Sequence, residues 1–346
     1  MSEAGPGLTY GAAGVDREVA ARAKSRIAQL VESTSTGDVV SKAGGFGGLF
    51  RVPAGFTSPV MVSSADGVGT KLKVAMMANR HDTVGIDLVN HCVNDILVEG
   101  ARPLFFLDYI GMGRLEQRIV EQLVEGLAAG CRDNGCVLLG GETAEMPDFY
   151  EPGEYDLAGF IVGMVDEDAR PGAHRVAAGD ALIGIAASGF HTNGYSLLRR
   201  LLFDTLHLGV DDRYPDSDAS VADVLLRPHR SYATALLPLI ADGRVRALSH
   251  ITGGGIPENL VRVLPEGVGA RIDRSSWSVP PEFTAVQAHG RVEESEMFLT
   301  FNMGVGMIVV ASPDHAASVV SSLRDAGEDA WLVGALEAGE REVVIA

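Results

Sequence analysis

The residues best suited to chemistry lie in the stretch 66–71, which reads Asp-Gly-Val-Gly-Thr-Lys. Residues 59–65 alternate as a strand does and residues 71–79 read as a helix, so we expect this hexad at a strand-to-helix turn. Its two glycines let the backbone approach a ligand, and the helix N-terminus and Lys71 attract phosphate. Asp66 would repel phosphate alone, which predicts a hard cation such as Mg²⁺ between the two. The spacing is not that of a Walker loop, and a turn capped by aspartate is an equally good interpretation of the hexad by itself.

A polar stripe follows on the next expected helix, residues 86–100. Apolar residues recur on one face of this helix, and the opposite face carries short polar side chains at helical spacing: Asp87, Asn90, His91, Asn94 and Asp95. Aspartate and asparagine are poor helix formers and good oxygen ligands for Mg²⁺. A solvated helix face would instead be rich in Lys, Glu and Arg. The stripe therefore favours a metal site over a solvated face.

A second glycine-rich segment lies nearer the N-terminus, at residues 42–50. It carries glycines around Phe46, at positions 44, 45, 47 and 48. Such a backbone can fold over a phosphate chain while the aromatic ring excludes water. A glycine-rich hairpin without a ligand explains the composition equally well.

The second half of the chain contains two more glycine-rich helix starts. The expected strand 181–187 leads into a turn with polar groups at Ser188, His191 and Asn193. Residues 252–255 read Thr-Gly-Gly-Gly before a helix expected at 257–264. Because the backbone N–H groups of a helix start bind anions, this recurrence supports phosphate chemistry better than any one loop does.

The strands and helices expected between these turns predict a protein in which sheets and helices pack in layers. Glu142 follows the expected strand 136–139, a position where ligands gather in layered α/β architectures, although it could equally cap a turn. Residues 151–158 are expected to form a loop and residues 300–310 a core strand. Longer helices are expected at 15–31, 115–134, 196–206, 221–240 and 313–326.

Length and charge limit the possible functions. A chain of 346 residues favours two domains, and a polar stretch places their boundary near residue 170, giving domains 1–170 and 171–346. The formal charge of −18 argues against a nucleic-acid partner. Without a long apolar run or a leader pattern, we expect no membrane association and a cytoplasmic location. The three cysteines, an odd number without a Cys-x-x-Cys pair, are expected to be core thiols.

Taken together, these motifs closely resemble the phosphoribosylformylglycinamidine cyclo-ligase family, also called aminoimidazole ribonucleotide synthetases. The resemblance covers nearly the whole chain from Leu8 to Ile345 and is carried by segments 66–71, 81–87, 92–95, 140–147, 188–195, 250–255 and 301–307. Related kinases and synthetases share the Asp-Gly-Val-Gly-Thr turn more loosely. Phe190 departs from the family pattern, in which a smaller or aliphatic residue often precedes the histidine, and could reshape that loop.

The resemblance implies an α+β fold of two domains, each a mixed sheet layered with helices. It also implies a homodimer whose N-terminal sheets associate, with ATP near that interface. The implied reaction is the ATP-dependent cyclisation of formylglycinamidine ribonucleotide to 5-aminoimidazole ribonucleotide, with release of ADP and phosphate, in purine biosynthesis. The first domain would hold ATP and Mg²⁺, and the second would hold the substrate phosphate.

On this basis each candidate residue receives an expected role. Catalytic roles are assigned to Lys71, Asp95 and His191, and Mg²⁺ to Asp66, Asp87 and Asp95. ATP is assigned to Gly44, Gly45, Phe46, Gly47, Gly67, Gly69, Thr70 and Lys71. The substrate is assigned to Glu142, Ser188, His191, Asn193, Thr252, Gly253 and Gly254. The alternatives are another ATP-dependent kinase or synthetase of the same superfamily and a catalytically silent nucleotide-binding regulator.

Overall fold

The first half of the chain folds into a four-stranded mixed sheet with the order β1-β4-β2-β3. The computed structural model describes residues 17–41 and 45–346. The strands of this sheet are β1 (Pro59–Gly67), β2 (Arg102–Met112), β3 (Val137–Glu145) and β4 (Tyr155–Asp166). Strand β4 is antiparallel to both neighbours, whereas β2 and β3 run parallel. The expected mixed sheet is therefore confirmed for this half.

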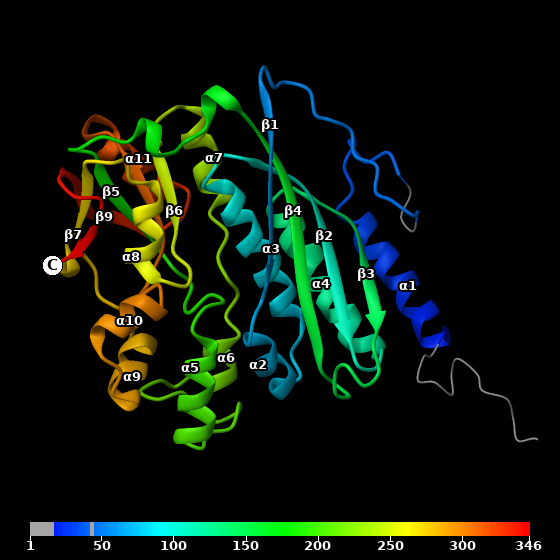
Figure 1. Ribbon diagram of the computed structural model, residues 1–346. Coiled ribbons are helices and arrows are strands. Elements are labelled where there is room, and N and C mark those ends of the chain that lie inside the picture. Colours follow the sequence, from blue (N-terminus) through cyan, green and yellow to red (C-terminus); the bar gives the residue numbers. More distant parts are fainter. Residues whose placement is uncertain (1–16, 42–44) are drawn as a thin grey trace, which may run out of the picture.

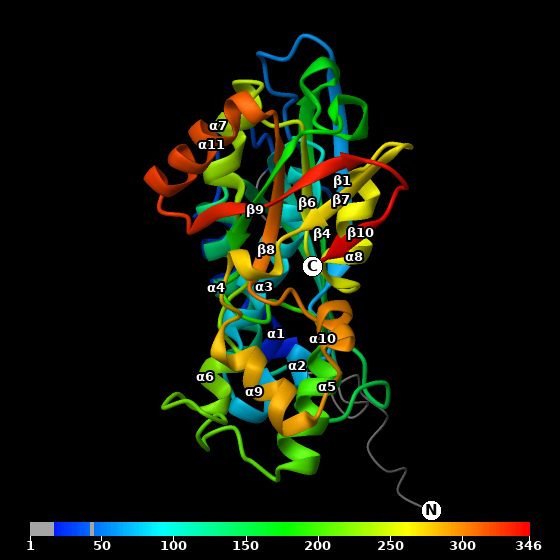
Figure 2. The ribbon, with the colours of Figure 1, turned by 90° about the vertical axis from the view of Figure 1, so that its left-hand side faces the viewer.

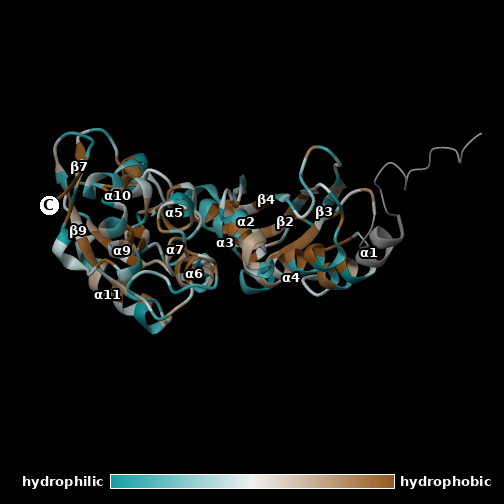
Figure 3. Ribbon diagram, turned by 90° about the horizontal axis from the view of Figure 1, so that it is seen from below, coloured by the Kyte–Doolittle hydropathy of each residue, from teal (hydrophilic) through white to brown (hydrophobic). Residues whose placement is uncertain are grey.

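Helices cover one face of this sheet. They are α1 (Arg17–Glu32), α3 (Asp82–Leu97) and α4 (Gln117–Asp133), while α2 (Lys71–Ala78) packs against α3. Helices α3 and α4 pack closely because each has a glycine at the crossing: a Cβ on Gly126 would lie 1.9 Å from the Asp82 carbonyl oxygen. Figure 3 shows α4 and α1 on one side of the strands. The helix layer thus fixes α3 firmly against the sheet.

No described helix covers the other face of the sheet. Side chains that point away from α3 alternate along the strands with those that point toward it, as the pleat requires. On this face Met61 is 63% exposed and Phe160 is 48% exposed. Phe50 covers a part near β2, where its ring centre lies 5.3 Å from that of Phe105. The rest is an apolar sheet face open to solvent.

The second half forms a six-stranded mixed sheet with the order β10-β7-β9-β5-β8-β6. Its strands are β5 (Ala181–Ala186), β6 (Ala247–His250), β7 (Val268–Ile272), β8 (Val305–Ala311), β9 (Ala330–Ala338) and β10 (Val343–Ile345). Only β10 and β7 pair in parallel. The α+β class predicted from the sequence is confirmed by the two mixed sheets.

Helices of the second half lie around this sheet and against the first half (Figures 1 and 2). Their bounds are α5 (Tyr195–Arg199), α6 (Val221–Leu225), α7 (Ala233–Ala241), α8 (Gly255–Leu260), α9 (Pro281–Gly290), α10 (Glu294–Thr300) and α11 (Pro313–Asp325). A π-helical stretch η3 (Arg200–Thr205) continues α5, and short 3₁₀ turns occur at η1 (Glu167–Ala169), η2 (Ala173–Arg175), η4 (Val261–Val263) and η5 (Arg274–Ser276). Helix α3 contacts α7 and β6, and α2 contacts α6, so these elements join the two halves.

Several predicted elements were wrong in extent. The helix expected over 221–240 is two helices, α6 and α7, because Pro228 interrupts it and leaves residues 226–232 outside regular structure. Strand β3 continues to Glu145, so Glu142 lies within the strand instead of beyond it. Strand β4 begins at Tyr155, inside the expected loop 151–158, and β8 begins only at Val305. None of the described helices meets the length and apolarity that a membrane crossing needs.

Candidate functional site

The hexad forms the turn between β1 and α2, at the boundary of the two halves. Val68 is buried and anchors the turn, while Gly69 has a φ of +67° that favours glycine. A Cβ on Gly69 would meet nothing within 4 Å, so the turn is open on that side. The Thr70 hydroxyl lies 3.2 Å from that of Ser196 across the boundary. Gly67, Gly69 and Thr70 are thus placed where a ligand can approach.

Lys71 is completely buried between the two halves. Its ammonium donates to the backbone carbonyls of His191 at 3.1 Å and Arg227 at 2.9 Å, and it lies 2.8 Å from Asp87 Oδ2. The other oxygen, Asp87 Oδ1, accepts from the His229 N–H at 2.6 Å. Burial lowers the pKa of Lys71 and raises that of Asp87, and each is opposed by the charge of the partner. The structure therefore places both residues in the protein interior, where they pair with each other and with the backbone of the second half.

Two asparagines extend this buried contact along α3. Asn90 Nδ2 donates to the His229 carbonyl at 2.7 Å, and Asn94 Nδ2 donates to the Arg230 carbonyl at 2.8 Å. Asn94 Oδ1 accepts from the Tyr232 N–H at 3.1 Å. We call Lys71, Asp87, Asn90 and Asn94 the interface group. Its polar atoms satisfy the backbone of the irregular segment 226–232, whose peptide groups would otherwise be buried without partners.

The other two residues of the stripe, His91 and Asp95, pair with residues outside the helix. His91 Nε2 lies 2.8 Å from Asp66 Oδ2, and His250 Nδ1 lies 2.9 Å from Asp95 Oδ1. The carboxylates are 42% and 27% exposed, whereas the imidazoles are 8% and 4% exposed. We call Asp66, His91, Asp95 and His250 the carboxylate–imidazole group. It presents two acids to solvent with two imidazoles behind them.

Hydrogen bonds set the charges of this group. Burial alone would raise the pKa of Asp66, but its hydrogen bond with His91 holds that pKa below the ordinary value. Asp95 behaves alike through His250 and through the Ser64 hydroxyl, which donates to it at 3.1 Å. Burial alone would lower the pKa of His91, but Asp66 and Asp95 raise it. Both carboxylates are therefore ionised, as a cation site requires.

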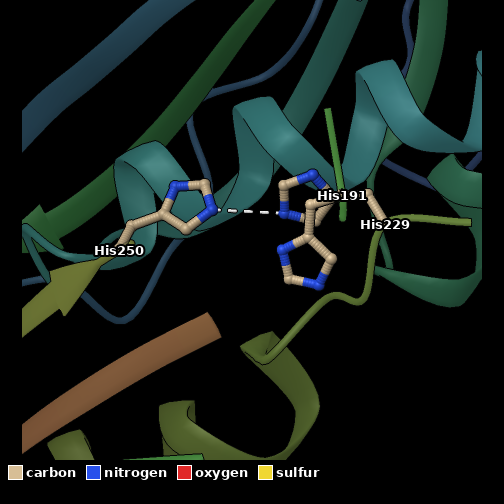
Figure 4. A group of neighbouring side chains, drawn as sticks. All are labelled: His191, His229 and His250. Carbon is tan, nitrogen blue, oxygen red and sulfur yellow. Dashed lines mark hydrogen bonds between the residues drawn. The ribbon is translucent and has the colours of Figure 1, made fainter. Parts of the chain in front are cut away.

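Three buried histidines, His191, His229 and His250, lie close together, as Figure 4 shows. His229 Nε2 lies 3.2 Å from His250 Nε2, and the His191 ring stacks on His229 with centres 3.9 Å apart. Burial lowers the pKa of both His191 and His229 well below the ordinary value, which keeps the stacked rings neutral. His191 takes a left-handed φ of +58°. Its Nε2 accepts from the Ser188 N–H at 3.1 Å, and its buried Nδ1 has no partner among the described residues.

The substrate candidates of the second half lie around this centre. The Ser188 hydroxyl donates to the Pro228 carbonyl at 2.6 Å, so it is held by the protein. Asn193 lies beside the second glycine turn, since a Cβ on Gly253 would be 3.4 Å from Asn193 Oδ1. Thr252 contacts Asn259 at 3.3 Å, and Gly254 has a φ of +90°. The structure thus brings Asn193 and the turn 252–254 together near His191. Phe190 is buried against Phe283 and Phe301, so it anchors this loop.

The first glycine-rich loop lies elsewhere. Gly44 is outside the described residues, and Gly45, Phe46 and Gly47 are exposed. The next residue, Gly48, lies against Leu139 on β3, and β3 and β1 are opposite edges of the sheet. Glu142 is on β3 too. Within one chain these candidates are therefore separated from Asp66 by the width of the sheet, about 14 Å at the usual strand spacing.

Sequence reasoning missed the role of His229. The apolar pattern predicts a continuous helix over 221–240 that contains this residue, although Pro228 directly before it is a signal that the helix ends. The stripe on α3 drew attention to His91, but nothing in the local pattern indicated its partners Asp66 and Thr192. His250 enters the sequence analysis only as the first residue of the family segment 250–255. These contacts join residues far apart in the chain, which local patterns do not report.

Comparison with known sequences covers both halves of the chain. The sequence models of the AIR synthase related protein match residues 53–165 with the N-terminal domain and residues 177–346 with the C-terminal domain. A phosphoribosylformylglycinamidine cyclo-ligase of Trichlorobacter lovleyi is 49% identical over 330 residues, 95% of each chain. One from Sorangium cellulosum is 50% identical over 329 residues, 94% of each chain.

Solved structures share the fold at much lower identity. A thiamine-monophosphate kinase from Stenotrophomonas maltophilia has a TM-score of 0.68 at 16% identity and covers 96% of each chain. The hydrogenase maturation protein HypE in complex with ATP has a TM-score of 0.64 at 16% identity, covering 91% of this chain and 88% of its own. The full-length sequence matches, together with the two-sheet fold, show that the chain belongs to the phosphoribosylformylglycinamidine cyclo-ligase family of AIR synthases, which are ligases of purine biosynthesis.

Proposed function

We propose that this chain uses ATP to cyclise formylglycinamidine ribonucleotide to 5-aminoimidazole ribonucleotide. In this reaction the formamide oxygen accepts the γ-phosphoryl group, the ribosylated amidine nitrogen attacks the activated carbon, and phosphate leaves as the ring closes. ADP is the other product. The observation that carries the proposal is the carboxylate–imidazole group at the open turn between β1 and α2, beside the polar turns of the second half.

The carboxylates fit a divalent cation. Asp66 and Asp95 come from adjacent elements, are ionised, and keep part of their surface open to solvent. When bound, Mg²⁺ neutralises negative charge on the phosphoryl group during transfer. The open hexad turn, with Gly67, Gly69 and Thr70, would contribute backbone N–H groups to the phosphates.

The second half would position the acceptor. Asn193 and the turn 252–254 would offer hydrogen-bond groups to the substrate, and His191 belongs to the same turn as Asn193. Lys71 acts indirectly, because its ammonium ties the His191 and Arg227 carbonyls to Asp87 and so holds the two halves in register. Alignment of the reacting groups contributes much of the rate acceleration when a reaction needs little covalent chemistry from the protein.

A homodimer would complete the site. The helix-free face of the first sheet exposes Met61 and Phe160, and an apolar face of this kind is characteristic of an interface. A second copy on this face would bring its own exposed loop at 45–48 and Glu142 toward the first copy. Sedimentation at micromolar concentration tests this: a dimer is expected for the native chain and a monomer for Phe160→Asp, whereas a stable, active native monomer would refute it.

The activity itself is tested with purified chain, formylglycinamidine ribonucleotide, ATP and a divalent cation. The expected result is 5-aminoimidazole ribonucleotide in a one-to-one ratio with ADP. Phosphorylation of a different acceptor would favour a related kinase or synthetase, and nucleotide binding without turnover would favour a regulator. Either result would overturn the proposal.

A further inference from the structure

The chain contains two asparagines that are directly followed by glycine, in the pairs Asn134–Gly135 and Asn193–Gly194. In such a pair the peptide nitrogen of the glycine can attack the side-chain carbonyl carbon of the asparagine, because glycine has no Cβ to hinder the approach. Ammonia leaves as a cyclic imide forms, and water then opens the imide to aspartate or isoaspartate. The reaction needs no enzyme and no oxidant, and it makes asparagine a thermally labile residue. In a folded protein it depends on the freedom of the side-chain amide and of the glycine N–H.

The fold protects the first pair. Asn134 is 8% exposed, and its amide nitrogen donates to Asn90 Oδ1 at 2.7 Å and to the Gly130 carbonyl at 2.8 Å. Its amide oxygen accepts from the Ser231 hydroxyl. The Gly135 N–H donates to a backbone carbonyl of the same turn at 3.1 Å. Because both reacting groups are held, attack at this position requires that these hydrogen bonds open first.

The second pair lies in the turn before α5 and lacks this protection. Asn193 is half-buried, and its side-chain amide forms no hydrogen bond with residues 17–41 or 45–346. Its nearest polar surroundings are the second glycine turn, where a Cβ on Gly253 would lie 3.4 Å from Asn193 Oδ1. The Gly194 N–H likewise donates to none of the residues that the structure describes. Both reacting groups are therefore free of hydrogen bonds that would have to break.

The packing around the second pair also requires the glycine that makes it reactive. Gly194 has a φ of +78°, and a Cβ there would lie 2.2 Å from the Phe301 ring. A larger residue at this position is therefore disfavoured both by backbone strain and by collision with Phe301. At Gly135 the φ is +63°, but a Cβ would meet nothing within 4 Å. The labile dipeptide at 193–194 is thus a consequence of the tertiary packing.

We propose that Asn193 is a site of spontaneous deamidation, at which the Gly194 nitrogen attacks Asn193 Cγ and ammonia is released. Addition of water to the imide gives a carboxylate in place of the amide. In the isoaspartate product the main chain also runs through the β-carbon, which lengthens the turn by one methylene. Both products place a negative charge beside the turn 252–254. The effect on activity rests on the proposed function, in which these turns bind an anionic substrate that the new charge repels.

The test follows both pairs in one sample of the full-length chain. The native protein is incubated for several days at mildly alkaline pH, where the peptide nitrogen loses its proton more readily. It is then digested under acidic conditions, which slow the reaction, and the peptides are analysed by mass spectrometry and by labelling with an isoaspartate-specific methyltransferase. Conversion of Asn193 is expected to be at least about 30-fold faster than that of Asn134, because the hydrogen bonds of Asn134 must open first. Conversion at Asn193 that is no faster than at Asn134 would overturn the proposal.

The same chain unfolded in urea is the control for the role of the fold. Without tertiary structure, the two pairs are expected to react at rates within about threefold of each other. If Asn193 reacted as selectively in urea as in the native protein, its local sequence would explain the difference, and the argument from hydrogen bonding would be refuted.

Two variants test the chemistry and the protection separately. Asn193→Gln keeps an amide but should abolish conversion at 193, because the longer side chain must close a six-membered ring. Ser231→Ala removes one hydrogen bond from Asn134 and is expected to speed conversion there by about 3–10-fold while the rate at Asn193 stays unchanged. An unchanged rate at Asn134 would contradict the protection by hydrogen bonds. Circular dichroism confirms that each variant is folded.

Activity measurements separate this inference from the proposed function. The rate of product formation is expected to fall in proportion to the modified fraction, and Asn193→Asp is expected to raise the KM for the ribonucleotide by at least about tenfold, because like charges then face each other. A fully modified chain with native kinetics would refute the effect on activity. A chain that forms no product but converts selectively at Asn193 would refute the proposed function and leave the modification site standing.

Discussion

The two sides of the polar stripe on α3 have similar residue types and opposite surroundings. The interface group is buried, and its polar side-chain atoms form hydrogen bonds with the backbone of segment 226–232. In the carboxylate–imidazole group, the two members on α3, His91 and Asp95, directly follow Asn90 and Asn94 in the sequence. This group exposes two ionised carboxylates to solvent. Aspartate occurs in both. Asp87 is neutralised by Lys71 inside the protein, whereas Asp95 is held by hydrogen bonds at the surface.

This difference shows that a short acidic side chain on a helix has two uses. One is to satisfy buried peptide groups where an irregular segment crosses the helix. The other is to bind a cation where the helix reaches solvent. Changes in the first group should therefore affect stability, and changes in the second should affect turnover and metal binding.

The largest effect is expected from Asp95→Asn. Loss of one charged cation ligand should lower kcat by about 10²–10³-fold, because charge neutralisation dominates phosphoryl transfer. The midpoint of thermal unfolding should change little, since the side chain is partly exposed. Steady-state assays with Mg²⁺ and with Mn²⁺ measure this, with Asp216→Asn as the control. A wild-type rate at ordinary metal concentration would contradict the assignment of Asp95.

Lys71→Met tests the interface group. Removing the ammonium leaves Asp87 buried without its partner, which should lower the free energy of unfolding by about 3–5 kcal/mol. Urea unfolding measures the change. The matched control is Lys73→Met, whose ion pair with Glu154 is exposed and should contribute less than about 1 kcal/mol.

Replacing both members of the buried pair gives a sharper test. Lys71→Met combined with Asp87→Leu should recover part of the lost stability, because no uncompensated charge remains. A Lys71→Met variant of native stability with a raised KM for ATP would instead support a phosphate-binding role for this lysine.

A smaller effect is expected from Asn94→Ala. The change leaves the Arg230 carbonyl and the Tyr232 N–H without their partners, which should lower the free energy of unfolding by about 1–3 kcal/mol. Chemical unfolding of this variant is compared with Ser318→Ala on the exposed surface of α11. Equal stability of the two variants would show that water replaces the lost bonds.

The smallest effect concerns Asp108, a partly buried carboxylate. Burial raises the pKa of Asp108 to about 7, and the negative charge of Glu142 adds to the shift. Because the folded pKa exceeds the unfolded one, this group's contribution to stability is complete below about pH 4 and is lost as pH rises through 7. Asp108→Asn should therefore raise the unfolding midpoint by roughly 2–5 °C at pH 8 and change it little at pH 4. Equal effects at both pH values would contradict the shifted pKa.

The sequence alone determined the elements whose signals are local. The period of apolar residues placed α3, α4 and β1, and glycine composition indicated the turn at 66–71, because glycine adopts the left-handed backbone seen at Gly69 more easily than other residues. Several family motifs in one order indicated the family. Composition and periodicity predict helices, strands and turns because the formation of these elements depends mainly on residues a few positions apart in the sequence.

The tertiary structure decided which polar residues meet. Lys71 and Asp87 carry the residue types of a phosphate and metal site, yet the chain packs them under segment 226–232. Asp66, His91, Asp95 and His250 come from β1, α3 and the end of β6, and only the packing of α3 against both halves brings them together. Burial and charge pairing depend on these long-range contacts, so residue type and local spacing could not separate the interface group from the carboxylate–imidazole group.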